Sequence, residues 1–417
     1  MLSWIITRWH KFRTGCSYLA HLVRTNPTLA AITVEGFLTR FGFGMIGFAL
    51  PLYAVSLGMS LAEIGVLYAI RTLVTVVFKP LMGWVADRFG SKLTLVIAVA
   101  MRCVIGFLFI FADQPWHLYV LRILHGVMTA ARDPSATSLI AENGKQNRMA
   151  SAFAWYLTAR DVGRSLGYGV AGILIALASY QVVFSVAFVA SCAALFTVKR
   201  YVRSDVQRAA HIPKRKDTSV KAVVPAEDPP VVIEYRHFIG YASFGMMVTL
   251  TSEMMRGLFP VIAVQYAHLT EMQAGITAMA SSIAILFAGP FFGWLADNVD
   301  RKLSLSFRGI ANIFSSLFYL FMPNFPGFLT ARVLDDTGKA AFRPAWGSVL
   351  AEISAAKPTH RGRIIAVVDS GITLGEMLGP LLAGVLVAAF GVPAMLGVRV
   401  LLAVITEIQA LIVFRKK

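Results

Sequence analysis

Charged residues and cysteines are scarce in this chain, and their scarcity sets the first limits on what the protein is. Only 15% of its 417 residues are charged while 57% are hydrophobic, which excludes an ordinary soluble domain and indicates a membrane protein with several spans. Its three cysteines, Cys16, Cys103 and Cys192, are scattered, so neither a disulfide framework nor a zinc site is predicted. Phosphate-binding Gly-Lys-Ser/Thr loops, His-Glu-x-x-His motifs and nucleophile elbows are missing, so we expect neither an enzyme nor a cofactor.

We also expect no cleavable signal peptide. Residues 1–28 carry several basic and aromatic side chains but no long apolar core. We expect this basic segment to be cytoplasmic, either as an amphipathic helix in the membrane interface or as a partly ordered tail.

Long hydrophobic runs dominate the rest of the chain. A membrane helix needs about 20 mostly apolar residues, and twelve such candidates can be placed. Their approximate bounds are 29–54, 61–84, 93–112, 116–140, 148–178, 181–198, 237–265, 273–294, 303–321, 326–350, 363–390 and 394–414. Residues 199–236 are polar, with nine Lys or Arg against five Asp or Glu, and form a linker between halves at 29–198 and 237–417.

The net charge of +17 is distributed very unevenly over the predicted loops. The six connections assigned to the outside, near 55–60, 113–117, 179–181, 266–272, 322–326 and 391–393, contain no Lys or Arg. This asymmetry predicts cytoplasmic termini and a cytoplasmic linker, so the charge requires no nucleic-acid partner. We expect a monomer, multi-pass in the lipid bilayer of a cytoplasmic (inner) membrane.

Two short loops repeat 210 residues apart. The first is Gly83-Trp-Val-Ala-Asp87-Arg88-Phe-Gly90-Ser91-Lys92, and the second is Gly293-Trp-Leu-Ala-Asp297-Asn-Val-Asp-Arg301-Lys302. The same displacement relates Arg122 and Glu142 to Arg332 and Glu352, and a displacement of 212 relates Gly167 and Gly172 to Gly379 and Gly384. The chain is therefore predicted to be a duplicated six-helix unit.

These loops resemble the signature loop of the major facilitator superfamily, G-x-x-x-D-R-x-G-R-K. The resemblance implies an all-α membrane fold of twelve helices in two parallel six-helix repeats, with the substrate path between them. It also implies gating loops, here Gly83, Asp87, Arg88 and Gly90 with Glu142, and Gly293, Asp297 and Arg301 with Glu352. Ser91 replaces the family's arginine, so an ion-pair triad is expected only in the second half. The alternative is a loop that only sets topology.

Charged residues inside the predicted spans mark the candidate transport path, because each is costly there. On the tenth span Arg332, Asp335, Asp336 and Lys339 share one helical face. The candidate proton-coupling residues are Asp335, Asp336, Glu253, Glu376 and Asp161. The candidate substrate-cavity residues are Arg40, Arg122, His125, Arg164, Arg256, Arg332 and Lys339. The alternative is a set of structural ion pairs.

Glycines also recur at helical spacing on the fifth and eleventh spans. The run from Gly167 to Gly172 matches a dinucleotide-binding fingerprint but lies within an apolar segment without a preceding strand. Glycines every four residues permit close helix packing, which is the role we expect.

A chain without nucleotide machinery would have to draw on an ion gradient. The sequence resembles the drug–proton antiporter branch most, which implies proton-coupled export of a small organic or amphipathic compound. Asp335 or Asp336 is then the expected proton carrier, with Arg332 and Arg256 contacting or resetting the site. Two alternatives stay open: a transporter of an organic anion or a lipid headgroup, and a transport-inactive sensor or scaffold.

Overall fold

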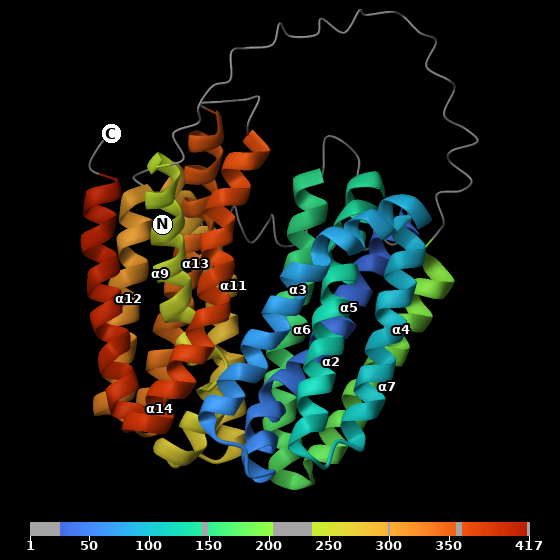
Figure 1. The fold of residues 1–417 in the computed structure, drawn as a ribbon, viewed down its shortest axis with the longest axis horizontal. Helices are drawn as coiled ribbons and strands as arrows, with labels where there is room; N and C mark the ends of the chain where they lie inside the picture. The colour runs from blue at the N-terminus through green and yellow to red at the C-terminus, as the bar shows by residue number, and fades with distance from the viewer. Residues whose placement is uncertain (1–25, 144–148, 203–235, 299–300, 356–360, 415–417) are drawn as a thin grey trace, which may run out of the picture.

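The first six helices of the computed structural model form one bundle. The structure describes residues 26–143, 149–202, 236–298, 301–355 and 361–414, so the basic segment up to 25 and most of the linker lie outside the described residues. The six helices stand side by side in Figure 1. They are α2 (Pro27–Ser56), α3 (Leu61–Phe89), α4 (Ser91–Ile110), α5 (Pro115–Asn143), α6 (Met149–Leu177) and α7 (Tyr180–Tyr201).

The second bundle follows the same plan with two breaks. It contains α9 (Arg236–Arg256), α10 (Phe259–Val261), η2 (Ile262–Tyr266), α11 (Glu271–Asn298), α12 (Arg301–Phe321), α13 (Phe325–Ala355) and α14 (Arg361–Val413). The seventh span was predicted to be continuous but bends by 45° between α9 and α10, where Pro260 lacks a backbone N–H and cannot continue the helical hydrogen bonds. Gly391, with φ 81°, divides α14 into two helices. The described part of the chain thus holds the twelve predicted segments and confirms the all-α fold.

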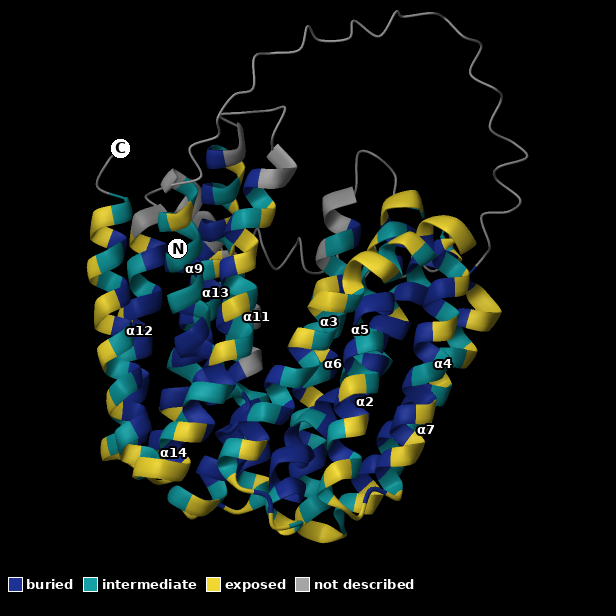
Figure 2. Cartoon of the chain, in the orientation of Figure 1, coloured by how far each residue is buried: buried dark blue, intermediate teal, exposed yellow. Residues whose placement is uncertain are grey.

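Polarity is reversed relative to a soluble protein. Large apolar side chains such as Phe196 (64% exposed) and Phe321 (74% exposed) cover the outside, whereas Glu35, Asp335 and Arg399 are fully buried. Figure 2 shows the exposed residues on the outer faces of both bundles. Within the described residues, five helices are long and apolar enough to cross a membrane, or six if the bent pair counts as one span. An apolar exterior around a charged interior is typical of a protein immersed in lipid.

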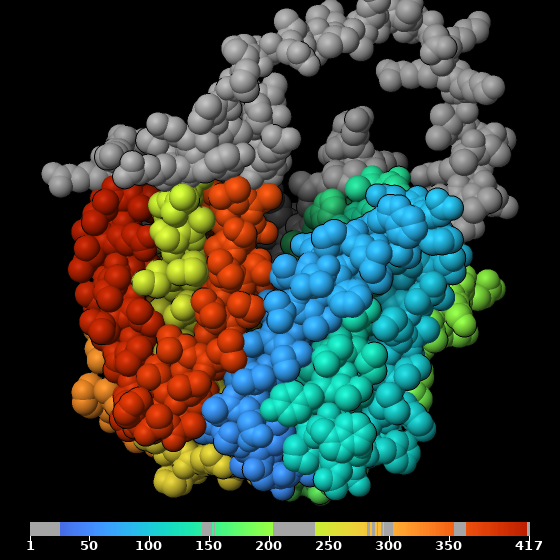
Figure 3. Space-filling model, viewed as in Figure 1, coloured from blue at the N-terminus to red at the C-terminus, as the bar shows by residue number. Residues whose placement is uncertain are grey.

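Glycines join the two bundles on the side predicted to face outward. A Cβ atom on Gly172 of α6 would lie 2.8 Å from the Cα of Gly275 on α11, and one on Gly384 of α14 would lie 3.3 Å from the Cα of Gly65 on α3. Figure 3 shows α3 and α14 adjoining in the lower half of the view. Within the first bundle Gly163 and Gly167 face α2, and within the second Gly371 and Gly375 face α9. The packing role predicted for these glycines is confirmed.

Candidate functional site

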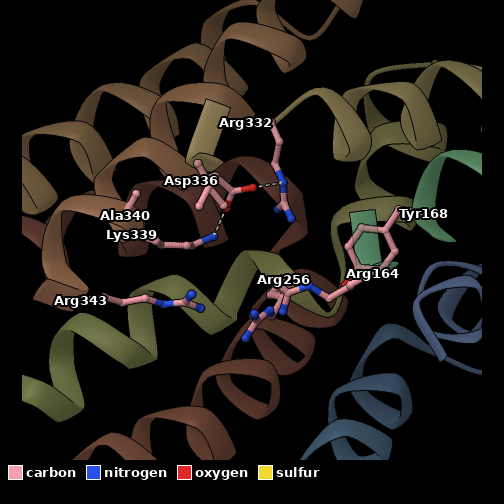
Figure 4. Close-up of a pocket in the computed structure, with 9 residues that line it drawn as sticks. Arg164, Tyr168, Arg256, Arg332, Asp336, Lys339, Ala340 and Arg343 are labelled. Carbon is pink, nitrogen blue, oxygen red and sulfur yellow. Dashed lines mark hydrogen bonds and ion pairs between the residues drawn. The ribbon is translucent and has the colours of Figure 1, made fainter. Parts of the chain in front are cut away.

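A pocket lies between the two bundles and is lined by nine described residues (Figure 4). The first bundle contributes Arg164 and Tyr168 from α6; α9 and α11 contribute Arg256 and Ile285. The remaining five residues lie on α13 and are Arg332, Asp336, Lys339, Ala340 and Arg343. Five of the nine side chains are basic and one is acidic, so the pocket wall carries an excess of positive charge.

Asp336 is the acid of this wall, and its carboxylate is held from three sides. The Nζ atom of Lys339 donates to it at 2.7 Å, the hydroxyl of Ser281 donates at 2.7 Å, and the Nε atom of Arg332 lies 3.3 Å away. These cations lie one helical turn from Asp336 on α13, as the sequence spacing predicted.

Asp335 lies behind the wall and is fully buried. Its carboxylate forms ion pairs of 2.8 Å each with Arg308 of α12, Lys339 of α13 and Arg399 of α14. Arg399 also donates to the hydroxyl of Ser316 at 2.8 Å. One buried acid thus ties three helices together, and a buried carboxylate needs such compensation.

Sequence reasoning missed Arg308 and Arg399. Arg308 is the single charge of its apolar predicted span, and Arg399 shares its span only with Glu407. A charge in such a segment is itself an indication of an interior partner. Nothing in the spacing of either residue showed that the partner was Asp335.

The arginines of α6 and α9 in the pocket also form ion pairs. Glu253 binds Arg256 at 2.6 Å, and Asp161 binds Arg164 at 2.9 Å. Asp161 also lies 3.6 Å from Arg343, which links α6 of the first bundle to α13 of the second. Glu376 on α14 is half-buried and has no cation within ion-pair distance among the described residues.

Three predicted cavity residues of the first bundle do not line the pocket that the described residues form. Arg122 on α5 lies 4.3 Å from the ring centre of Tyr68 and donates to the carbonyl of Leu67 at 3.3 Å. His125 packs edge-on against Phe43, with ring centres 4.6 Å apart. Arg40 is half-buried on α2. The structure therefore brings together the cavity candidates of α6, α9 and α13 but not those of α2 and α5.

The first signature loop joins α3 to α4 through Gly90, whose φ of 90° favours glycine. Asp87 is exposed, and Arg88 stacks on the Trp84 ring at 5.7 Å. Among the described residues Asp87 makes no ion pair, as expected from the missing arginine.

The serine in place of that arginine has its own partner. The Ser91 hydroxyl lies 3.3 Å from the carboxylate of Glu142, which also accepts a 2.6 Å hydrogen bond from Ser138. In the second loop the burial of Gly293 and the side chains of Asp297 and Arg301 lie outside what the structure describes, while Glu352 is half-buried on α13.

The chain matches the family model of the Major Facilitator Superfamily over residues 33–255 and 238–417. It is 26% identical over 364 residues to the multidrug resistance protein MdtG of Proteus mirabilis, covering 85% of this chain and 88% of that protein. It is 25% identical over 369 residues to the quinolone resistance protein NorA of Staphylococcus aureus, covering 87% and 90%.

Solved structures of the same fold include two transporters. The nucleoside transporter NupG superposes with a TM-score of 0.71 at 14% identity, covering 94% of this chain and 99% of that one. A bacterial homologue of the human lysosomal transporter Spinster, inward-facing and occupied, superposes with a TM-score of 0.71 at 14% identity, covering 93% and 96%.

Proposed function

Because the chain belongs to the Major Facilitator Superfamily, whose members are membrane transporters rather than enzymes, we propose that it exports a small organic or amphipathic compound in exchange for protons. The observation that carries this proposal is a pocket between the two bundles, lined from both and containing the acid Asp336. A site of this kind can open to either side when the bundles rock against each other. The relatives named for drug and quinolone resistance support a small organic compound and export.

Asp336 is the proton carrier in this proposal. It faces the pocket, and both of its cationic partners sit on long side chains that can move away and return. Return of Arg332 and Lys339 favours the charged carboxylate and so expels the proton. Asp335, paired with the buried Arg308 and Arg399 and with Lys339, is the structural acid. Glu253, Glu376 and Asp161 are reserve carriers.

The orientation belongs to the same proposal. The charge asymmetry of the loops supports cytoplasmic termini in a cytoplasmic membrane. Cysteines introduced at residues 58, 114 and 324 should react with an impermeant thiol reagent from outside, whereas one at residue 220 should not. The reverse labelling pattern would reject this topology.

Transport is tested on the full-length protein in vesicles that contain a pH-sensitive dye. Candidate compounds should move protons through the wild type but not through empty vesicles. Replacing Asp336 by asparagine keeps the size of the side chain but removes its titration, so transport driven by a pH gradient should stop while substrate counterflow persists. The matched control is Asp113→Asn, at an exposed carboxylate outside the pocket.

Two results would count against the proposal. If Asp336→Asn retained gradient-driven transport, the proton would travel on another acid. If the wild type moved neither protons nor any compound, the chain would be a facilitator fold serving as a sensor or scaffold.

A further inference from the structure

The charge of the pocket wall restricts the class of compound that fits it. Five basic side chains against a single acid leave the lining positive. Resting on the proposed function of this pocket, we infer that the transported compound carries an anionic group, a carboxylate, sulfonate or phosphate, and that Arg332 binds it.

Arg332 has N–H groups that make no hydrogen bond to the described part of the chain, although its guanidinium lies over the Phe259 ring at 4.5 Å. The residue is 5% exposed, and neither its Nε nor its Nη1 atom donates a hydrogen bond to a described residue. The Nε atom lies 3.3 Å from Asp336, which is an ion-pair distance without hydrogen-bond geometry. A buried guanidinium with free N–H groups is costly, and an anionic oxygen from a ligand in the pocket would satisfy them.

The acids behind the wall do not reverse its charge. Glu253 compensates Arg256, and Asp161 is shared between Arg164 and Arg343. Lys339 bridges Asp335 and Asp336, but Asp335 also pairs with Arg308 and Arg399, which add two further cations. The cluster therefore remains positive when every paired acid is counted, and in a site of low dielectric it attracts anions and repels cations.

The remaining lining supports an amphipathic anion. Tyr168 and Ile285 give the pocket one aromatic and one aliphatic surface beside the basic groups. Arg164 and Tyr168 come from the first bundle, and Arg332 comes from the second (Figure 4). A flat apolar body with an acidic group would thus contact both bundles at once, and so can stabilise the state in which they close on it.

The test uses two fluorescent probes, carboxyfluorescein as an aromatic anion and ethidium as an aromatic cation. Transport is followed in vesicles, and equilibrium binding is followed by fluorescence anisotropy on the purified full-length protein in detergent. Wild type should bind and move the anion in preference to the cation. Arg332→Gln should weaken binding of the anion roughly ten- to a hundredfold, the value of a charge-assisted hydrogen bond, and should not weaken that of the cation. Arg332→Lys keeps the charge but loses the planar guanidinium. Its affinity for the anion should therefore lie between those of the wild type and Arg332→Gln.

Two further variants keep this test decisive. Arg200→Gln, at an exposed arginine on α7, is the matched control and should match wild type. Should Arg332→Gln fail to fold, Arg343→Gln removes a lining charge whose side chain is 60% exposed, so it leaves the interior intact. It should weaken binding of the anion about two- to fivefold.

The possible results separate the two proposals. If ethidium is transported and the anion neither binds nor moves, the transport function stands and the inference is wrong. If Arg332→Gln weakens both probes equally, Arg332 has a structural role and the inference is again wrong. If no compound moves but the anion binds wild type and not Arg332→Gln, the anion site stands and the transport proposal fails.

Discussion

Helices α5 and α13 hold equivalent places in the two bundles but accommodate their charges differently. Arg122 and Arg332 are counterparts, and both lie over an aromatic ring, Tyr68 at 4.3 Å and Phe259 at 4.5 Å. One turn further on, His125 on α5 corresponds to Asp335 on α13. Among the described residues His125 contacts an aromatic ring, whereas Asp335 binds three cations. The duplicated scaffold has kept its arginine, but at the position one turn further on only α13 carries an ionic network. The ion pairs of α5 lie further along the helix, where Arg132 binds Glu35 of α2 at 2.6 Å.

The aromatic contacts of α5 and the ionic contacts of α13 differ in how strongly they depend on each partner. A cation over an aromatic ring is worth about 0.5–2 kcal/mol and needs no acid. A buried ion-pair network is far more sensitive, because removing one partner leaves the others as uncompensated charges. Because the network of α13 lines the pocket, protonation and substrate charge can act on the structure there.

The largest expected effect comes from Asp335→Asn. The change removes the carboxylate between three cations, so we expect a loss of about 3–5 kcal/mol of unfolding free energy and a lower melting temperature. The matched change on the other copy is His125→Asn, which loses an aromatic contact worth about 1 kcal/mol. Thermal unfolding in detergent, followed by tryptophan fluorescence, measures both. Equal losses would remove the contrast between α5 and α13.

The charged contacts differ between the two bundles, whereas the glycine contacts at the interface between them are alike on both sides. Gly172 meets Gly275, and their repeat counterparts Gly384 and Gly65 meet on the other side of the interface. A valine at position 172 would place its Cβ 2.5 Å from the carbonyl oxygen of Glu271, and one at 384 would place it 2.5 Å from that of Leu61.

Both valine substitutions should therefore force the bundles apart on the predicted outer side. Overpacking costs about 1–3 kcal/mol, and the open-outside state avoids it. Spin labels at residues 114 and 322 should report longer distances for Gly172→Val and Gly384→Val alike. Gly397 is an exposed glycine with open space around it, so Gly397→Ala should leave the spin-label distance unchanged. A response to only one of the two valines would show that the interface is not symmetric.

The sequence was sufficient for the scaffold because membrane spans, loop charges and the 210-residue repeat are all local or periodic patterns. It also predicted that Arg332, Asp336 and Lys339 share a face, since helical spacing alone decides this. The ion pairs between Asp335 and the two arginines at 308 and 399 depend on which faces of separate helices meet. One sequence contains no pattern that determines this.

The same limit explains the candidates on the first bundle. Arg122 and His125 were expected in the cavity because their spacing matches that of Arg332 and Asp335. The aromatic rings that they contact, Tyr68 and Phe43, lie on other helices. Spacing on α5 therefore predicted the face but not the direction in which that face points.

The smallest effect concerns the signature loops, where the two copies differ in a third way. In the first loop Ser91 is a neutral hydrogen-bond donor near Glu142, while the sequence of the second retains both Asp297 and Arg301. An exposed ion pair is worth at most about 1 kcal/mol, and a neutral contact at an exposed carboxylate less. Asp297→Asn should therefore shift the protein toward cytoplasmic accessibility more than Asp87→Asn, because only the second loop retains the later arginine, Arg301, at the position where the first has Ser91. Spin-label distances across the cytoplasmic side measure both variants. Equal shifts would mean that Arg301 does not stabilise the second loop through Asp297. The asymmetry between the bundles would then be confined to the pocket wall.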